Sequence, residues 1–157
     1  MPVGQRLWSL PGCKLEEIEV GESEIIVRAK TTRPRARCPN CGQLSRRVHS
    51  HYVRHLQDMP ISTRGVHVEL MVRRFRCHTA GCKRQTFAEP LPGITSSHSR
   101  RTDRLTDVLW HLGQVAGGSP GARLSQHLRM PISRPTLLRL LRSEVEEVTH
   151  TPRIIGL

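Results

Sequence analysis

The chain has 157 residues, the size of one ordinary domain or two small ones. Aromatic residues make up only 3 % of it, which disfavours one large core and favours small modules that need additional support. No apolar run is long enough to cross a bilayer, and the N-terminus lacks the sustained apolar stretch of a secretory signal. These features argue against a membrane or exported protein, and we expect a cytoplasmic one.

The net charge of +12 is concentrated in the middle of the chain. Residues 28–84 contain fourteen basic and two acidic side chains, so their excess equals that of the whole protein. A GC-rich coding bias explains why arginine outnumbers lysine, but it does not explain the lack of acids in this segment. Such a field favours a polyanionic partner, and arginine suits phosphates and guanine edges.

Alternating apolar residues predict the β elements in the first two thirds of the chain. Residues 14–31 predict a hairpin around a Gly-Glu-Ser turn, and residues 44–57 predict one or two short strands. Residues 66–73 form the clearest strand pattern, which runs on toward Phe75 and Cys77. Residues 90–99 have the proline, glycine and serine content of a linker.

After residue 100 the apolar period changes to about 3.6 residues, which is typical of α-helices. Residues 105–116 predict a first helix that ends at Gly117-Gly118. Ser119 followed by proline predicts the cap of a second, short helix, and Ser133 can cap a third. The apolar stripe of the third helix consists of Leu137, Leu140, Leu141, Val145 and Val148.

Four of the five cysteines form two pairs, Cys38-x-x-Cys41 and Cys77-x4-Cys82. Four thiolates suit a closed, tetrahedral structural Zn(II) site, which would stabilise a module with so few aromatic residues. The alternatives are two unrelated pairs of reduced thiols, or a redox CxxC motif, although no thioredoxin-like pattern surrounds it. Nearby histidines (His49, His51 and His78) could replace a cysteine, and Cys13 is expected to be inert.

The order helix, short helix, tight turn, helix over residues 101–148 is that of a helix-turn-helix, whose last helix enters the major groove of DNA. Arg139 and Arg142 are three residues apart, away from the leucine stripe, and Arg134 and Thr136 lie at the N-terminal end of this helix. The alternative is a generic three-helix bundle with solvated arginines.

Taken together, these motifs resemble the bacterial insertion-sequence transposases of the ISL-three type. The resemblance rests on CPNCGQLSRRVHSHYVRHLQDMP, VELMVRRFRCHTAGCKRQTFAEPLP, RRTDRL, GGSPGARLSQHL and PISRPTLLRLLR. It covers residues 35–143 and implies that the four paired cysteines bind zinc and that the third helix recognises the terminal repeats of a mobile element.

The same resemblance implies that a ribonuclease-H-like catalytic domain with an Asp/Asp/Glu triad follows a strand resembling Arg153–Leu157, where this chain ends. The three aspartates present are Asp58, Asp103 and Asp107, and they do not form the set that two-metal chemistry requires. We therefore expect no enzyme activity from this chain alone.

The expected fold class is α+β: a small β-rich, zinc-ribbon-like module followed by a three-helix helix-turn-helix domain. The expected parts are a hairpin segment (1–37), a four-cysteine zinc module (38–92), a linker (93–100), a helix-turn-helix (101–148) and a tail or truncated strand (149–157).

The expected function is duplex-DNA binding as part of a bacterial transposase, in the cytoplasm and at the nucleoid when DNA-bound. A transposase component that works with a separate catalytic chain, or a second copy of itself, is an alternative, as is a zinc-ribbon protein-interaction or regulatory module. No small-molecule substrate is expected. The expected DNA contacts are Arg46, Arg47, Arg73, Arg74, Arg76, Lys83, Arg84, Arg134, Thr136, Arg139 and Arg142.

Overall fold

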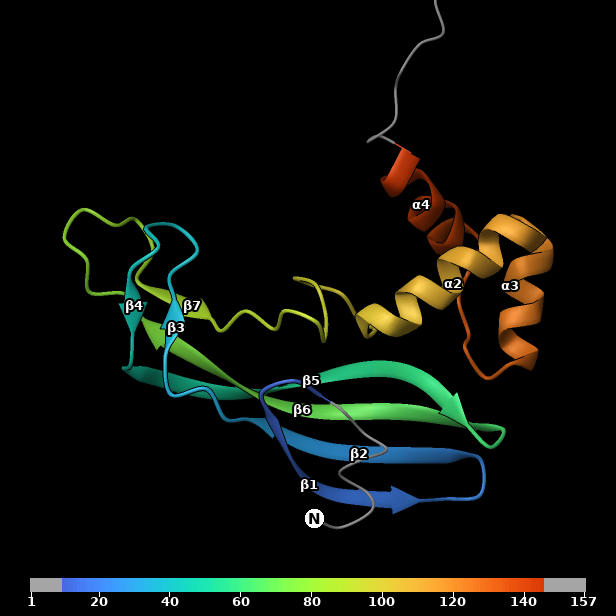
Figure 1. Ribbon diagram of the computed structural model, residues 1–157, viewed down its shortest axis with the longest axis horizontal. Helices are drawn as coiled ribbons and strands as arrows, with labels where there is room; N and C mark the ends of the chain where they lie inside the picture. The colour runs from blue at the N-terminus through green and yellow to red at the C-terminus, as the bar shows by residue number, and fades with distance from the viewer. Residues whose placement is uncertain (1–9, 146–157) are drawn as a thin grey trace, which may run out of the picture. The chain divides into compact units, whose positions relative to one another are not determined.

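A computed structural model of the chain describes residues 10–145 (Figure 1). The chain divides into two compact units, with the boundary after Leu105. The first unit is built on β-strands and the second consists of helices, so the predicted α+β class is confirmed. None of the described helices is long and apolar enough to cross a membrane.

The first unit contains a five-stranded sheet and a small two-stranded one. The large sheet has the order β1-β2-β6-β5, and β7 also pairs with β6, while β3 pairs with β4. The strand bounds are β1 Cys13–Val20, β2 Glu24–Thr31, β3 Ala36–Arg37, β4 Leu44–Ser45, β5 Val48–Ile61, β6 Arg64–Arg76 and β7 Thr86–Ala88.

The predicted N-terminal hairpin is confirmed as the antiparallel pair β1–β2. Its outer face carries the acids of the N-terminal segment, and basic side chains neutralise them. Arg28 forms ion pairs with Glu17, Glu19 and Glu69. Lys30 pairs with Glu16. The acids near the N-terminus therefore leave most of the arginines elsewhere in this unit uncompensated.

The β5–β6 pair is longer than the sequence predicts. Residues 44–57 were expected to hold one or two short strands, but β5 has 14 residues and continues to Ile61. Its polar sequence reflects exposure of one face, because Leu56 and Asp58 are buried while Gln57, which lies between them, is not. Ser62 and Thr63 both adopt positive φ (46° and 66°), the geometry of a tight two-residue hairpin turn, although neither is glycine.

The apolar core lies on one face of the sheet. Strand β2 pairs in parallel with β6, which aligns Val27 with Val68 and Ala29 with Leu70. Leu91 and Ile94, in the segment that resembles a linker, are buried in the same cluster, so this segment covers the sheet rather than passing it in solvent. Residues 90–99 thus fold back as a loop over the sheet, and this loop covers the apolar face of the sheet as a second layer.

The start of the first helix is tied to the sheet by a buried carboxylate. Asp58 is 0 % exposed and accepts hydrogen bonds from the Thr102 hydroxyl (2.7 Å), Arg104 Nε (2.7 Å) and the Met59 amide (2.9 Å). Burial of the carboxyl opposes ionisation, but these hydrogen bonds outweigh it and lower the pKa of Asp58.

The three predicted helices are present, as α2 (Asp103–Ala116), α3 (Gly118–His127) and α4 (Arg134–Val145). The predicted cap of α3 is wrong. Gly117, not Ser119, occupies the N-cap position, with φ 72° and ψ −172° and no capping hydrogen bond from a side chain. Such backbone angles are essentially restricted to glycine, so they fix where α3 begins.

Leu137 of α4 is completely buried in the helical unit. A Cβ added at Gly113 of α2 or at Gly121 of α3 would lie only 3.0 Å from a Cδ atom of Leu137, which is closer than normal packing allows. The glycines therefore let the helices approach α4 closely. Val148, expected in the same apolar stripe, lies outside the described residues.

Candidate metal centre and nucleic-acid surface

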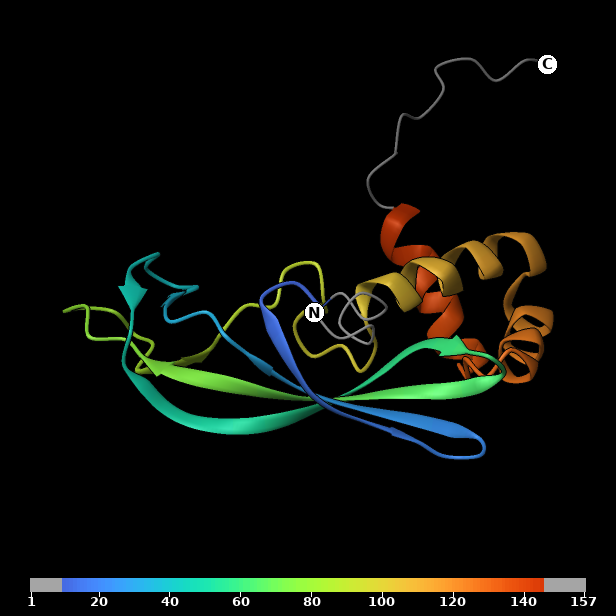
Figure 2. The ribbon, with the colours of Figure 1, turned by 60° about the horizontal axis from the view of Figure 1, so that its bottom comes forward.

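Each cysteine pair lies on a tight loop that joins two paired strands. Strands β3 and β4 flank the first loop, and the Cys38 amide donates to the Gln43 carbonyl (2.8 Å). Strands β6 and β7 flank the second, and the Cys77 amide donates to the Gln85 carbonyl (2.8 Å). Figure 2 shows both loops at the same end of the long strands β5 and β6.

The two loops bring the four sulfurs of Cys38, Cys41, Cys77 and Cys82 within 4.8 Å of one another. The sulfurs of the two loops interleave: Cys38 Sγ lies 4.0 Å from Cys82 Sγ, and Cys41 Sγ lies 3.6 Å from Cys77 Sγ. A tetrahedral zinc ion with bonds of about 2.3 Å places its sulfur ligands about 3.8 Å apart. The cluster therefore fits one structural zinc ion, and two unrelated thiol pairs do not describe it.

The surroundings of the sulfurs favour thiolates. The Thr79 hydroxyl and the Gln43 amide lower the pKa of Cys41 to about 6. The Thr79 amide, followed by its hydroxyl, lowers that of Cys77. At Cys82 the Arg84 amide and Asn40 act in the same direction, but burial, followed by the contacts with the sulfurs of Cys77 and Cys41, raises its pKa overall. A divalent cation removes this conflict by binding all four as thiolates.

A small apolar cluster supports the metal centre. Phe75 and Phe87, opposite each other on β6 and β7, stack with their ring centroids 6.0 Å apart and are almost fully buried. Ala36 and Cys38 complete this cluster, which is separate from the main core. Four buried residues give little hydrophobic stabilisation, so zinc supplies much of the stability at this end of the sheet.

The remaining cysteine and the nearby histidines lie outside the metal cluster. Among the described residues, the group able to hold a metal ion contains neither Cys13 nor a histidine. Cys13 is half-buried, and burial together with the charge of Glu89 raises its pKa to about 11, although Arg33 acts against the rise. It is therefore a protonated, weakly reactive thiol at neutral pH.

Most of the expected DNA-contacting residues in the zinc module are exposed. Those with exposed side chains are Arg46, Arg47, Arg74, Arg76, Lys83 and Arg84. They lie on β6, on the loops that carry the cysteines, or close to these elements. They remain available to a ligand.

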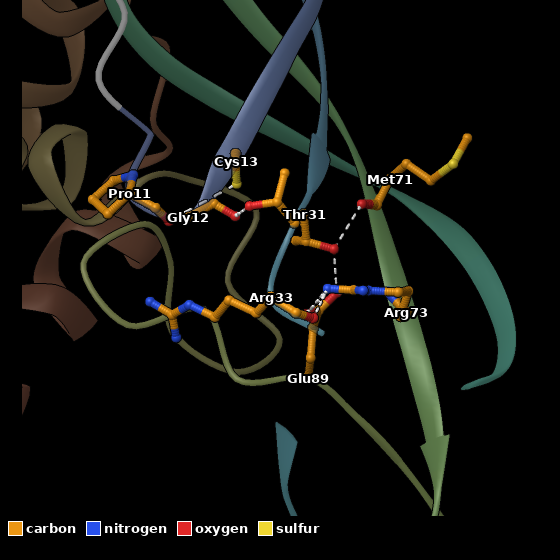
Figure 3. Close-up of polar contacts among 9 residues, drawn as sticks. Pro11, Gly12, Cys13, Thr31, Arg33, Met71, Arg73 and Glu89 are labelled. Carbon is orange, nitrogen blue, oxygen red and sulfur yellow. Dashed lines mark hydrogen bonds and ion pairs between the residues drawn. The ribbon is translucent and has the colours of Figure 1, made fainter. Parts of the chain in front are cut away.

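Arg73 differs from this expectation because its side chain is only 15 % exposed. Its guanidinium contacts Glu89 through Nε (3.3 Å) and Nη2 (3.1 Å), and Nη2 also donates to the Arg33 carbonyl. Thr31 donates to the same carboxylate (Figure 3). The Arg73 side chain is therefore engaged in contacts within the protein, and it is a poorer candidate for a DNA contact than the exposed arginines.

The expected contacts on α4 share one surface. Arg134, Arg139 and Arg142 line a shallow hollow together with Pro135 and Leu138. Thr136 is half-buried, and its hydroxyl lies 2.8 Å from that of Ser133, so it closes the first turn of the helix. The three arginines are exposed, whereas Leu137 of the same helix is buried.

A groove is lined by Arg74 and Arg84 together with three residues that were not among the expected DNA contacts, Tyr52, Arg54 and Arg100. Tyr52 and Arg54 are two residues apart on β5, so the strand period indicates that they share a face. Nothing in the sequence indicates that Arg100 lies near them, because that proximity depends on the folded-back loop.

Residues 34–82 match a family model described as the zinc-finger of transposase IS204/IS1001/IS1096/IS1165. The match includes all four clustered cysteines and ends at Cys82. No curated protein and no solved structure matched the chain. The match agrees with the sulfur geometry and supports a transposase-related role in DNA binding. Residues 34–82 are therefore similar to the zinc ribbon of these insertion-sequence transposases, and their four clustered cysteines fit a structural zinc ion.

Proposed function

We propose that this chain binds duplex DNA as the DNA-recognition part of a transposase. The observation that carries the proposal is the transposase zinc ribbon at residues 34–82. The charge of the chain supports it, because residues 28–84, which contain this ribbon, carry an excess equal to the whole net charge of +12, and most of the arginines in the ribbon are exposed. By resemblance, the DNA recognised is the terminal repeat of a mobile element.

The three helices form the second part of the proposed DNA-binding surface, as a helix-turn-helix. Helices α3 and α4 are joined by residues 128–133, and Met130 and Ile132 of this connection are buried. We assign α4 as the recognition helix because Arg134, Arg139 and Arg142 face solvent together. Arginine makes bidentate contacts both with guanine edges and with phosphates.

We assign catalysis to a separate chain or to residues outside the described part of the protein. Asp58 is buried against Arg104, and Asp107 lies 3.7 Å from His111 on α2. In the described part of the chain, the metal-binding group found is the four-cysteine cluster, which is closed to substrate. The chain would then act as a subunit of a transposition complex, or as a repressor that competes for element ends.

The test is selection of bound sequences from a pool of random DNA duplexes by the zinc-loaded chain. Enrichment of a shared sequence supports the proposal, and failure to retain duplex DNA at low salt overturns it. A strand-transfer assay with Mg(II) tests the catalytic assignment: cutting or joining of DNA by the purified chain alone would contradict it. If the zinc ribbon instead binds a protein partner, unlabelled DNA will not compete with that partner.

A further inference from the structure

A groove of about 750 Å³ crosses the sheet face between the metal centre and the folded-back loop. Tyr52 and Arg54 of β5 and Arg74 of β6 lie along it. Arg84, from the second cysteine loop, and Arg100, from the loop before α2, also line it. Figure 1 shows the segment after β7 running along β5 and β6.

The groove is strongly basic. Four arginines line it, and the one acidic residue that lines it, Glu89, is already paired with Arg73. Among the described residues, no carboxylate forms an ion pair with Arg74, Arg84 or Arg100, whereas Arg28 on the hairpin has three such partners. Several uncompensated guanidinium groups in one channel favour a ligand with several negative charges.

Two contacts orient the groove before any ligand binds. The Arg74 guanidinium lies over the Tyr52 ring, 5.0 Å from its centroid, and this stacking holds the side chain while leaving its N–H edges free. Arg54 Nη2 donates to the carbonyls of Ser96 (3.2 Å) and Ser99 (2.6 Å), which fixes the loop that carries Arg100. A prearranged site loses less entropy on binding.

We infer that this groove holds the phosphodiester backbone of one strand of a DNA duplex, with Arg74, Arg84 and Arg100 in contact with phosphates. The inference rests on the proposed function and assigns it a specific surface that lies outside α4. A repeating anion fits better than a small one, because the four arginines come from four separate segments that line one long groove, namely β5, β6, the second cysteine loop and the loop before α2.

The experiment measures binding of a fluorescent random-sequence DNA duplex to the zinc-loaded full chain as a function of salt. Arg74→Gln, Arg84→Gln and Arg100→Gln are each expected to weaken binding about tenfold at 0.1 M salt. Each should also reduce the slope of log affinity against log salt by about 0.9. Arg35→Gln is the matched control, because Arg35 is exposed in the same unit and lies outside the groove. It should change the affinity less than twofold.

Substitutions of Tyr52 test the stacking contact separately. Tyr52→Phe keeps the ring and should bind DNA like the wild type, whereas Tyr52→Leu should weaken binding about as much as Arg74→Gln. Zinc content and far-UV circular dichroism show whether each variant is folded. Bound duplex should also protect Arg74, Arg84 and Arg100 from modification by phenylglyoxal, as read by peptide mass spectrometry.

The results separate this inference from the proposed function. If the wild-type chain does not bind duplex DNA, the proposed function fails and the groove assignment fails with it. A triple variant combines Arg74→Gln, Arg84→Gln and Arg100→Gln. If the wild type binds but this triple variant binds equally well with the same salt slope, while Arg139→Gln and Arg142→Gln weaken binding, the groove inference alone is overturned. Equal losses for Arg35→Gln and the groove variants would also overturn it.

Discussion

Glu89 closes a gap in the hydrogen bonding of β6. Along the same edge of this strand, β2 pairs with residues 65–71 and β7 pairs with residues 74–76. Between the two pairings, the Arg73 amide donates to a Glu89 carboxylate oxygen (2.9 Å), and the Glu89 amide donates to the Arg73 carbonyl (3.0 Å). One residue therefore satisfies both the backbone and the side chain of Arg73.

Glu89→Gln should lower the free energy of unfolding by roughly 3 kcal/mol, because it leaves the largely buried Arg73 guanidinium without a counter-charge. Urea titration of the zinc-loaded chain measures the loss. Glu22→Gln is the control, since Glu22 is exposed in the β1–β2 turn and should change stability by less than 0.5 kcal/mol. Equal stability of the two variants would contradict the assigned role of Glu89.

Asp58 makes stability depend on acid pH. Because its pKa in the folded state lies below its ordinary value of 3.8, its contribution is fully present above that value. It is lost as the pH falls through the lower, folded-state pKa. Asp58→Asn should therefore be less stable than the wild type by roughly 2 kcal/mol between pH 7 and 5. This difference should shrink below pH 4.

Denaturant titrations of the wild type and Asp58→Asn at each pH measure that difference. Both proteins release zinc alike in acid, so subtraction isolates the carboxylate. A difference that grows as the pH falls would rule out the assigned direction of the pKa shift.

The cysteine loops are the elements whose structure depends most on a bound ion. The purified chain should contain one zinc ion, and cobalt(II) substitution should give the absorption spectrum of tetrahedral thiolate coordination. Cys77→Ser should lose this spectrum and unfold the loops. Cys13→Ser should keep both, because Cys13 is outside the cluster. A metal-free but fully folded chain would refute the zinc centre.

Gly117 sets the junction between α2 and α3. A Cβ there meets no atom within 4 Å, so there is space for a side chain. The residue must be glycine because of its backbone angles. Gly117→Ala should therefore destabilise the helical unit by roughly 2 kcal/mol, as measured by thermal unfolding at 222 nm. Val115→Ala, at a position 90 % exposed, should be close to neutral. If Gly117→Ala is also neutral, the junction is not strained.

The local elements could be predicted from the sequence because their signals are local. The hairpin, the core of β6, the three helices and the paired cysteines each follow from residue spacing within about twenty positions. The parallel pairing of β2 with β6 could not be predicted, since its paired residues are 41 positions apart in the chain and neither strand carries a signal of its partner. The proline- and serine-rich composition of residues 90–99 likewise hid the burial of Leu91 and Ile94.

Among the candidate site residues, the metal cluster was predictable and the fate of each arginine was not. Because side chains alternate along a strand, Arg73 lies on the face opposite that of the buried Val72, and the sequence predicts that it is exposed to solvent. Only the return of β7 along β6 brings Glu89 over it. Arg100 reaches the groove through the same folded-back segment, so tertiary structure decides which cations are free to bind a ligand.

At the scale of the whole molecule, DNA binding should depend steeply on salt. A chain with net charge +12 that neutralises about six phosphates should lose roughly a thousandfold in affinity between 0.05 and 0.2 M salt. Fluorescence anisotropy with a DNA duplex measures this loss. An affinity that stays within a factor of two over that range would show that phosphate contacts do not dominate binding.

The β5–β6 ladder extends from the cysteine loops to the far turn of the sheet, with register shifts between Val48 and Ser50 and between Asp58 and Ile61. A 13-residue strand such as β6 spans at most about 43 Å. One helical turn of B-form DNA measures roughly 34 Å. The strand pair is therefore long enough for contacts near its two ends to meet the double helix about one turn apart, on the same side.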